Sequence, residues 1–263
     1  MIIVGFYDLS KDDRSKVVKK IYSDILESVK QEYNTDQIKE VTVSESILIY
    51  ASDKDTYIRK NAYNSFGKIY NDYADLRQNI LMILSKMMDN PDYKVRQTAV
   101  YALGEIGKKD VDSMIEIFER AFEDEHHAVR NAVMGSMKQM GQKNPKPTFK
   151  LARKYLHHKN PQIRKEMIHG IELRGRTHPE DVLPILKEME NDENKEVRRM
   201  VIHVAGQISY KKGCLEKVVN NLKNWENKEL VAEIVDEIVD VHKQYSFAVR
   251  SAEDAENYIK LNL

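Results

Sequence analysis

The sequence predicts an all-α protein, a right-handed α-solenoid (superhelix) of about six stacked helix pairs. The main observation is an arginine that recurs after an apolar residue at steps of 37, 34, 34 and 34 residues. Its copies are Arg59, Arg96, Arg130, Arg164 and Arg198. A sixth copy, at 229–232, follows about 33 residues later without the arginine. Such periods are typical of arrays in which each helix pair packs on its neighbours.

Apolar spacing within each copy indicates helices. In the second copy the apolar residues recur at the spacing of one helix face: Val95, Ala99, Ala102, Leu103 and Ile106. Gly107 can end this helix in the left-handed conformation, and residues 111–121 predict its partner. The chain has only 10 Gly and 6 Pro, which suits helices joined by short turns.

The remaining elements follow in order along the chain. Residues 12–33 predict a helix, whereas 36–50 are compatible with either a helix or a strand. The second helices of the pairs are expected at 76–88, 110–122, 147–157, 179–190 and 213–224. We therefore expect one continuous domain with an N-terminal helical cap at 1–50, a repeat array at 51–243 and a C-terminal cap helix at 244–263. Caps cover the ends of a repeat core.

The stretch from Val95 to Gly107 reads Val-Arg-Gln-Thr-Ala-Val-Tyr-Ala-Leu-Gly-Glu-Ile-Gly. It resembles the HEAT-repeat family in its short, bilin-lyase-like form, Val-Arg-x-x-Ala-x-x-Ala-Leu-Gly-x-Ile-Gly. The resemblance covers roughly residues 50–243. It implies HEAT-like helix pairs whose Val-Arg helices line a concave surface. It implies little about function, because these repeats serve many unrelated partners.

Composition excludes several classes of protein. The 42 Lys and Arg balance the 42 Asp and Glu, so no global charge attracts nucleic acid. A single cysteine, Cys214, excludes an intramolecular disulfide framework. The beginning of the chain shows no signal peptide, and no segment approaches the ~18 apolar residues that span a membrane. We expect a soluble, cytoplasmic protein without a membrane partner.

The recurring arginines have two interpretations. They could form a row of cations, or each could open a helix and hydrogen-bond turns of the neighbouring repeat, which the sequence favours. An acidic or amide residue precedes four of them by four positions: Asp55, Asp92, Asn160 and Asn194.

The polar positions of the Val-Arg helices form the candidate binding surface. In the arrangement that the family resemblance implies, they are a modestly basic strip: Lys60, Lys68, Gln97, Tyr101, Asn131, Lys165, His169, Arg199 and His203. The strip lacks the apolar row that an amphipathic helix would need. A solvated helix face would look much the same.

A basic block lies in the middle of the chain. Residues 141–176 hold ten Lys or Arg and two acids, whereas residues 226–263 hold nine acids and four bases. Such a block is a candidate footprint for phosphates or an acidic partner. Within it, Arg174 and Arg176 flank Gly175 and could approach one anion together. Thr177 could also cap the next helix, with Glu180 completing a capping box.

Signals for chemistry are weak. His169 and His203 occupy equivalent places in adjacent repeats, but neither a Cys nor a carboxylate completes a metal set at the level of the sequence. Cys214 has no catalytic signature around it, and no phosphate-binding glycine loop or nucleophile elbow occurs. We expect no metal and no small-molecule cofactor.

A second resemblance points toward catalysis. Residues 198–225 resemble one or two repeats of the bacterial DNA-alkylation-repair glycosylases, which are HEAT-like arrays that hold DNA in a basic groove. In that family catalysis depends on an aromatic residue, often Trp, beside an acid. Trp225 is the only Trp and is expected in a turn. Tyr101 and Glu105 are the nearest aromatic–acid pair on the expected groove face.

These observations favour a non-catalytic binding scaffold whose concave, locally basic surface holds an anionic partner. A nucleic-acid backbone is the sharpest candidate, and an acidic protein surface is close behind. The alternatives are a DNA-repair glycosylase relative and an adaptor for a protein complex.

Overall fold

A computed structural model describes residues 5–31 and 42–263 of the chain. The chain divides into two compact units, 1–136 and 137–263, and helix α7 (His127–Lys143) spans the boundary. Within the described residues all regular structure is helical. The all-α repeat class that the sequence predicts is therefore confirmed.

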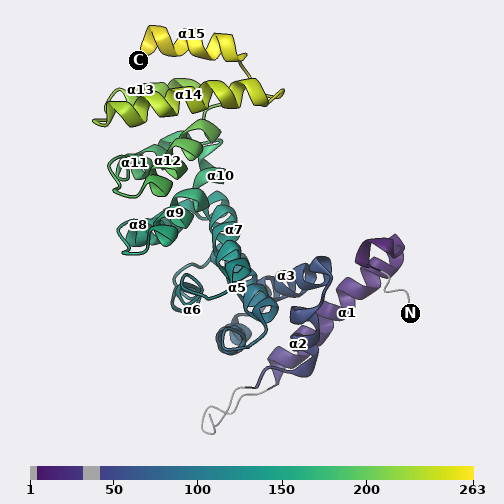
Figure 1. Cartoon of the computed structure of the whole chain (residues 1–263). Coiled ribbons are helices and arrows are strands. Elements are labelled where there is room, and N and C mark those ends of the chain that lie inside the picture. The colour runs from purple at the N-terminus through teal and green to yellow at the C-terminus, as the bar shows by residue number, and fades with distance from the viewer. Residues whose placement is uncertain (1–4, 32–41) are drawn as a thin grey trace. The chain divides into compact units, whose positions relative to one another are not determined.

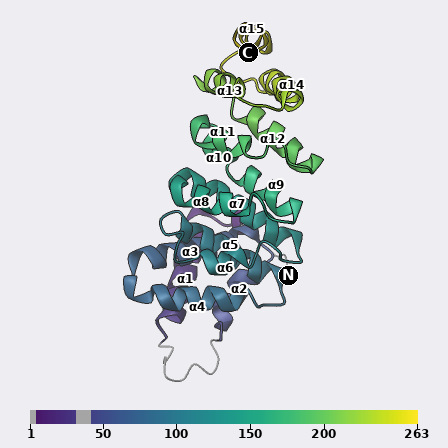
Figure 2. The ribbon, with the colours of Figure 1, turned by 90° about the vertical axis from the view of Figure 1, so that its left-hand side faces the viewer.

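The first unit is built around helix α3 (Thr56–Asp72), which packs against α1 (Lys11–Lys30), α2 (Glu45–Ser52) and α5 (Tyr93–Gly107). Helices α4 (Arg77–Met87) and α6 (Ile115–Glu119) complete it, with short 3-10 turns at Phe6–Asp8 and Ala74–Leu76. Figure 2 shows α1 to α5 gathered side by side.

The second unit stacks further helix pairs. Its helices are α8 (Pro145–Tyr155), α9 (Pro161–Gly170), α10 (Glu172–Gly175), α11 (Pro179–Lys187), α12 (Lys195–Gln207), α13 (Cys214–Leu222), α14 (Lys228–Gln244) and α15 (Ala252–Asn262). Helix α12 packs between α9 and α14, α11 packs on α13, and α15 covers α13 and α14. Figure 1 shows these pairs as successive layers that end at α15.

Most expected elements are present with shifted ends. The helix predicted at 12–33 is α1, and the helix predicted at 110–122 is reduced to α6 between turns. Of the ambiguous stretch, 36–41 lies outside the described residues, 42–44 is irregular and the rest is helical. The expected cap helix at 244–263 is α15 alone, because α14 extends to Gln244. The division into two caps and one array stays a prediction.

Side chains in the turns explain why each Val-Arg helix begins where it does. Asp55, Asp92, Asn160 and Asn194 are N-cap residues whose side chains accept a hydrogen bond from a backbone N–H two positions later. In the remaining copy, His126 accepts a hydrogen bond from the backbone N–H of Ala128 through its Nδ1. The acid-or-amide signal was thus a capping signal.

The recurring arginines brace these same turns. Each guanidinium donates to the carbonyl oxygen six positions earlier in its own turn, as Arg130 does to Asp124 and Arg198 does to Asp192. Arg96 and Arg164 also reach the next repeat, where they form two-bonded ion pairs with Asp124 and Asp192. The expectation of contacts with a neighbouring repeat is therefore correct for two of the five copies.

Close packing of consecutive Val-Arg helices depends on glycine eight positions after the arginine. A Cβ atom built on Gly67 would lie 2.5 Å from the Cβ of Glu105. A Cβ on Gly104 would lie 2.6 Å from the Cβ of Ser136, and one on Gly206 would lie still closer to the Cγ of Glu237. Only a residue without a side chain allows the two backbones to approach this closely.

Candidate partner-binding site

Three residues of the predicted strip come together in a cavity between α3 and α5, which we call the α3–α5 cavity. Its volume is about 310 Å³, and its lining is Thr56, Tyr57, Arg59, Lys60, Tyr63, Gln97, Thr98 and Tyr101. Lys60, Gln97 and Tyr101 were all predicted from the sequence, whereas Arg59 was assigned a structural role and Tyr63 was missed. Among the described lining residues none carries a carboxylate.

The chemistry of this cavity is that of hydrogen-bond donors. The rings of Tyr63 and Tyr101 have centroids 5.0 Å apart. Burial, with Tyr101 and Glu105 nearby, raises the pKa of Tyr63 to about 12, and burial also raises the pKa of Tyr101. Both phenols therefore stay protonated at neutral pH and can donate. Beside them, Lys60 is exposed, and Arg59 uses only one terminal nitrogen of its guanidinium in bracing its turn.

Lys68 belongs to a different cavity on the other side of α3. That cavity has a volume of about 470 Å³ and is lined by Val18, Lys19, Tyr22, Asn61, Asn64, Ser65 and Lys68. The Lys68 ammonium lies 4.9 Å from the centre of the Tyr22 ring, within the range of a cation–π contact. The structure therefore separates Lys68 from Lys60.

Arg199 and His203 lie in surroundings opposite to those expected. They line a cavity of about 420 Å³ between α12 and α14, the α12–α14 cavity, together with Ile202, Glu233, Asp236, Glu237 and Asp240. Four carboxylates thus face one arginine and one histidine. The expectation of a basic surface at this position is not met, because the neighbouring helix α14 supplies acids.

The arginines of the basic block are already paired. The guanidinium–carboxylate pairs are Arg153–Glu188, Arg164–Asp192, Arg174–Asp181 and Arg176–Glu172. Arg174 and Arg176 therefore hold two different carboxylates and do not converge on one anion. Thr177 does not cap α11, since His178 is the N-cap residue and the Thr177 hydroxyl donates to the Arg174 carbonyl. The exposed Arg199 pairs with Glu196 on its own helix.

Lysines remain available in the second unit. Lys143, Lys146, Lys150 and Lys159 are exposed and Lys165 is half-buried. Within the part of the chain that the structure describes, no ion pair joins these lysines to a carboxylate. Asn131 is also exposed, on α7. Of the predicted strip, Asn131 and Lys165 thus remain exposed or half-buried here, whereas the other four lysines belong to the basic block.

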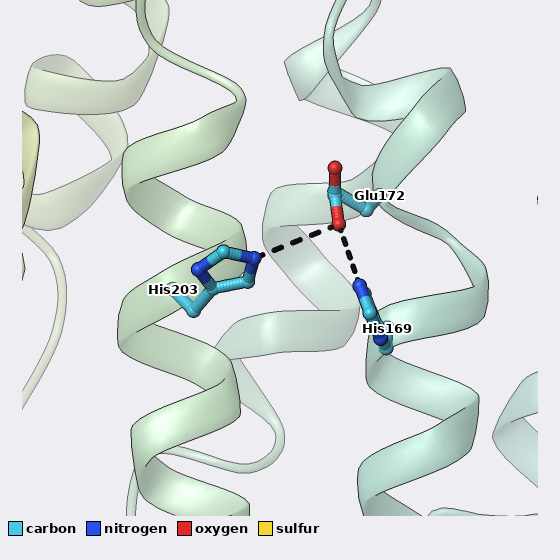
Figure 3. A group of neighbouring side chains, drawn as sticks. All are labelled: His169, Glu172 and His203. Atoms are coloured by element: carbon cyan, nitrogen blue, oxygen red, sulfur yellow. Dashed lines mark ion pairs between the residues drawn. The ribbon is translucent and has the colours of Figure 1, made fainter. Parts of the chain in front are cut away.

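His169 and His203 approach each other around a buried carboxylate. Figure 3 shows Glu172 between the two imidazoles, with both dashed lines ending on its Oε2. This oxygen is 3.0 Å from His169 Nε2 and 3.9 Å from His203 Nε2. Burial alone would raise the pKa of Glu172, but the His169 hydrogen bond and the charges of Lys138 and Arg176 lower it to about 2.

Glu172 is a site residue that the sequence reasoning missed, although the repeat pattern holds a signal. Lys138 and Glu172 stand eight positions after Arg130 and Arg164, where the other copies have Gly67, Gly104 and Gly206. Their side chains meet, with Lys138 Nζ 3.1 Å from Glu172 Oε2. When two successive repeats replace this glycine by residues of opposite charge, the pattern therefore indicates an ion pair between the repeats.

Trp225 and Glu105, which the sequence suggested for base excision, are buried and paired, respectively. Trp225 lies in a turn as expected, but it is 1% exposed, and its indole donates to Asn221. Glu105 pairs with Lys108. The family models that match this chain do not show a resemblance to DNA glycosylases.

The HEAT-repeat family model matches residues 149–235, which confirms the resemblance to HEAT repeats. The model of the sister chromatid cohesion protein PDS5 matches residues 48–169. No curated protein sequence is similar enough to this chain to count as a match. In the described residues, no helix combines the length and the apolar character needed to cross a bilayer.

Solved repeat structures resemble the chain weakly. An engineered protein is 12% identical, with 82% of this chain and 96% of that chain covered and a TM-score of 0.40. A chain of the Kap95:Nup1 complex is 13% identical, with 93% of this chain and 35% of that chain covered and a TM-score of 0.40. The CpcE–CpcF complex of phycocyanin lyase from Nostoc sp. is 14% identical, with 98% of this chain and 93% of that chain covered and a TM-score of 0.33. Likenesses at this level add nothing to the argument on function.

Proposed function

We propose that this chain of HEAT-like repeats is a non-catalytic binding scaffold that holds an acidic segment of a partner protein in the α3–α5 cavity. The observation that carries the proposal is the set of donors in that cavity. Arg59 and Lys60 supply positive charge, and Tyr63 and Tyr101 supply neutral hydroxyl donors. A carboxylate side chain can accept hydrogen bonds from all of them.

The size and position of the cavity favour a side chain on an extended segment. A volume of about 310 Å³ accommodates one or two side chains rather than a folded surface. Gln97 lines the cavity, is half-buried and donates through its amide nitrogen to the Ala128 carbonyl. Its amide oxygen is then suited to accept a hydrogen bond from the backbone of a bound peptide.

An acidic protein segment fits better than a nucleic-acid backbone. Nucleic acid requires several cations spread along a groove. In the second unit, however, the arginines of the basic block are paired with carboxylates, and Arg199 lines a cavity with four acids. The exposed lysines between 143 and 159 are the observation that keeps nucleic acid as the competing candidate.

Fluorescence anisotropy with labelled ligands tests the proposal. The ligands are a short peptide with spaced Glu residues, the same peptide with Gln at those positions, and single-stranded and duplex DNA, each over a salt series. We expect the Glu peptide to bind, the Gln peptide to bind at least about tenfold more weakly, and neither DNA to bind at physiological salt.

Two outcomes overturn the proposal. Tight DNA binding that falls steeply with salt, without peptide binding, would favour the nucleic-acid groove. Equal affinity for the Glu and Gln peptides would show that the cavity does not recognise a carboxylate.

A further inference from the structure

Three side chains of the fourth and fifth repeats converge in a way that the binding function does not use. His169 on α9, Glu172 on α10 and His203 on α12 each direct one nitrogen or oxygen to a common point, and these atoms all lie within 4.8 Å of one another (Figure 3). The two imidazoles and the carboxylate come from consecutive repeats. They therefore meet only because the repeats pack together.

The Glu172 carboxylate has one oxygen held by Arg176 and the other directed toward the two histidines. Arg176 holds Glu172 Oε1 through two hydrogen bonds from Nε and one terminal nitrogen. The other oxygen, Oε2, faces both imidazoles. Glu172 itself is 1% exposed, so its position is fixed by packing as well as by Arg176.

His203 has a second carboxylate behind it. Glu237 Oε1 lies 3.6 Å from His203 Nδ1, on the side of the ring opposite Nε2. A carboxylate at Nδ1 favours the tautomer that carries its proton there, which leaves the Nε2 lone pair free to bind a metal. A shift of a few tenths of an ångström would bring the pair to hydrogen-bond distance, the arrangement in which carboxylates orient metal-ligating histidines.

A cation already lies at this point. Lys138 Nζ is 2.8 Å from His169 Nε2 and 3.1 Å from Glu172 Oε2. The ammonium thus contacts two of the three converging atoms. Lys138 sits on a flexible stem with part of its side chain exposed, so it can leave when a more strongly held cation arrives.

We propose that His169, Glu172 and His203 form a binding site for a divalent transition-metal ion, best suited to zinc, for which the Lys138 ammonium competes. Two histidines and one carboxylate are a ligand set that zinc takes in proteins, with a fourth position left to water. Small shifts of the half-exposed His203 are sufficient to shorten the longest separation. The α12–α14 cavity, which His203 and Glu237 line, gives the ion a route from solvent.

Titration of the chelator-treated full chain tests the proposal. Zn²⁺ binding is followed by calorimetry, and Co²⁺ binding by the visible absorption of a tetrahedral ion. The wild-type chain should bind one ion. The double variant His169→Ala with His203→Ala should lose at least about a hundredfold in affinity, and Glu237→Gln about tenfold.

Competition between Lys138 and the metal ion gives a second prediction. It would fail if the three side chains formed only a structural cluster. Lys138→Ala should bind zinc several-fold more tightly than wild type. Lys143→Ala is the matched control, since it removes an exposed charge from the end of the same helix, and it should leave the affinity unchanged. Circular dichroism and thermal melting in chelator verify that each variant is folded.

The proposal is overturned if the double histidine variant binds zinc as tightly as wild type. It is also overturned if His127→Ala, at the exposed start of α7, removes the bound ion while the double variant keeps it. Unchanged or weaker binding by Lys138→Ala would contradict the competition.

Discussion

The α3–α5 cavity and the α12–α14 cavity occur at the same register of two repeats but have opposite character. Lys60 and Arg199 both follow the recurring arginine by one position. In the first unit α5 adds Gln97, Thr98 and Tyr101, and the cavity gathers donors. In the second unit α14 adds four carboxylates. Two adjacent repeats therefore set the charge of such a surface together, and the residue at one position of a single repeat does not predict it.

The helices beside the two cavities approach each other closely in the same way. Gly67 packs against Glu105 beside the first cavity, and Gly206 packs against Glu237 beside the second. The same close approach thus supports both surfaces.

The largest losses of stability should come from replacing the arginines that link neighbouring repeats, one within each unit. Arg164→Ala should lower the free energy of unfolding by about 3–5 kcal/mol, because it leaves Asp192, whose side chain is 5% exposed, without its partner. Arg96→Ala should do the same through Asp124. Arg198→Ala, which removes a bond to a carbonyl, should cost about 1 kcal/mol.

Urea unfolding of the purified variants measures these differences. Equal losses for Arg164→Ala and Arg198→Ala would contradict the assigned role of the ion pair. Arg164 and Arg198 both lie in the second unit, so comparing their variants needs no assumption about how the first unit unfolds.

The buried carboxylate of the second unit should make stability depend on pH. The folded pKa of Glu172 is about 2, against an ordinary value of 4.5. Because the folded state favours the ionised form, this contribution, about 3 kcal/mol, is present above pH ~5 and is lost as pH falls toward 2. The stability difference between wild type and Glu172→Gln should therefore shrink from pH 7 to pH 3.

Urea titrations at several pH values provide the measurement, with Glu196→Gln as the control. Glu196 is an exposed carboxylate paired with Arg199, so its variant should differ little from wild type at any pH. A difference for Glu172→Gln that stays constant with pH would contradict the lowered pKa.

Smaller effects are expected at the glycine contacts. Gly67→Ala should destabilise by about 1–3 kcal/mol, because its Cβ would meet the Cβ of Glu105, close to the backbone. Gly206→Ala should cost less, since it meets the more mobile Cγ of Glu237. Gly135→Ala is the control. Its nearest neighbour would be the Tyr101 ring at 3.5 Å, so it should be neutral or slightly stabilising. Thermal melting ranks the three, and an unstable Gly135→Ala would undermine the packing argument.

Periodicity predicted the fold well, because apolar spacing and capping residues are local signals. The arginine step located the Val-Arg helices, and Asp55, Asp92, Asn160 and Asn194 are caps. Helix ends were less predictable. Thr177 and Glu180 match a capping box, yet His178 begins α11, since the turn after Arg174 continues for one more residue.

The site was predictable only in part. Lys60, Gln97 and Tyr101 share a cavity because their register places them on facing helices. The pairing of Arg174 with Asp181 and the acids around Arg199 depend on side chains from other segments. Counting charges in residues 141–176 could not reveal these partners, since they lie outside that block or belong to another helix.

Charge reversal in the two cavities is the most direct test of the account. Lys60→Glu and Arg199→Glu are compared for binding of the labelled Glu-containing peptide by anisotropy. Lys60→Glu should weaken binding at least about tenfold, equivalent to about 1.4 kcal/mol, whereas Arg199→Glu should leave it unchanged. Equal losses in both variants, or a loss with Arg199→Glu alone, would contradict the assignment of the acidic partner to the α3–α5 cavity.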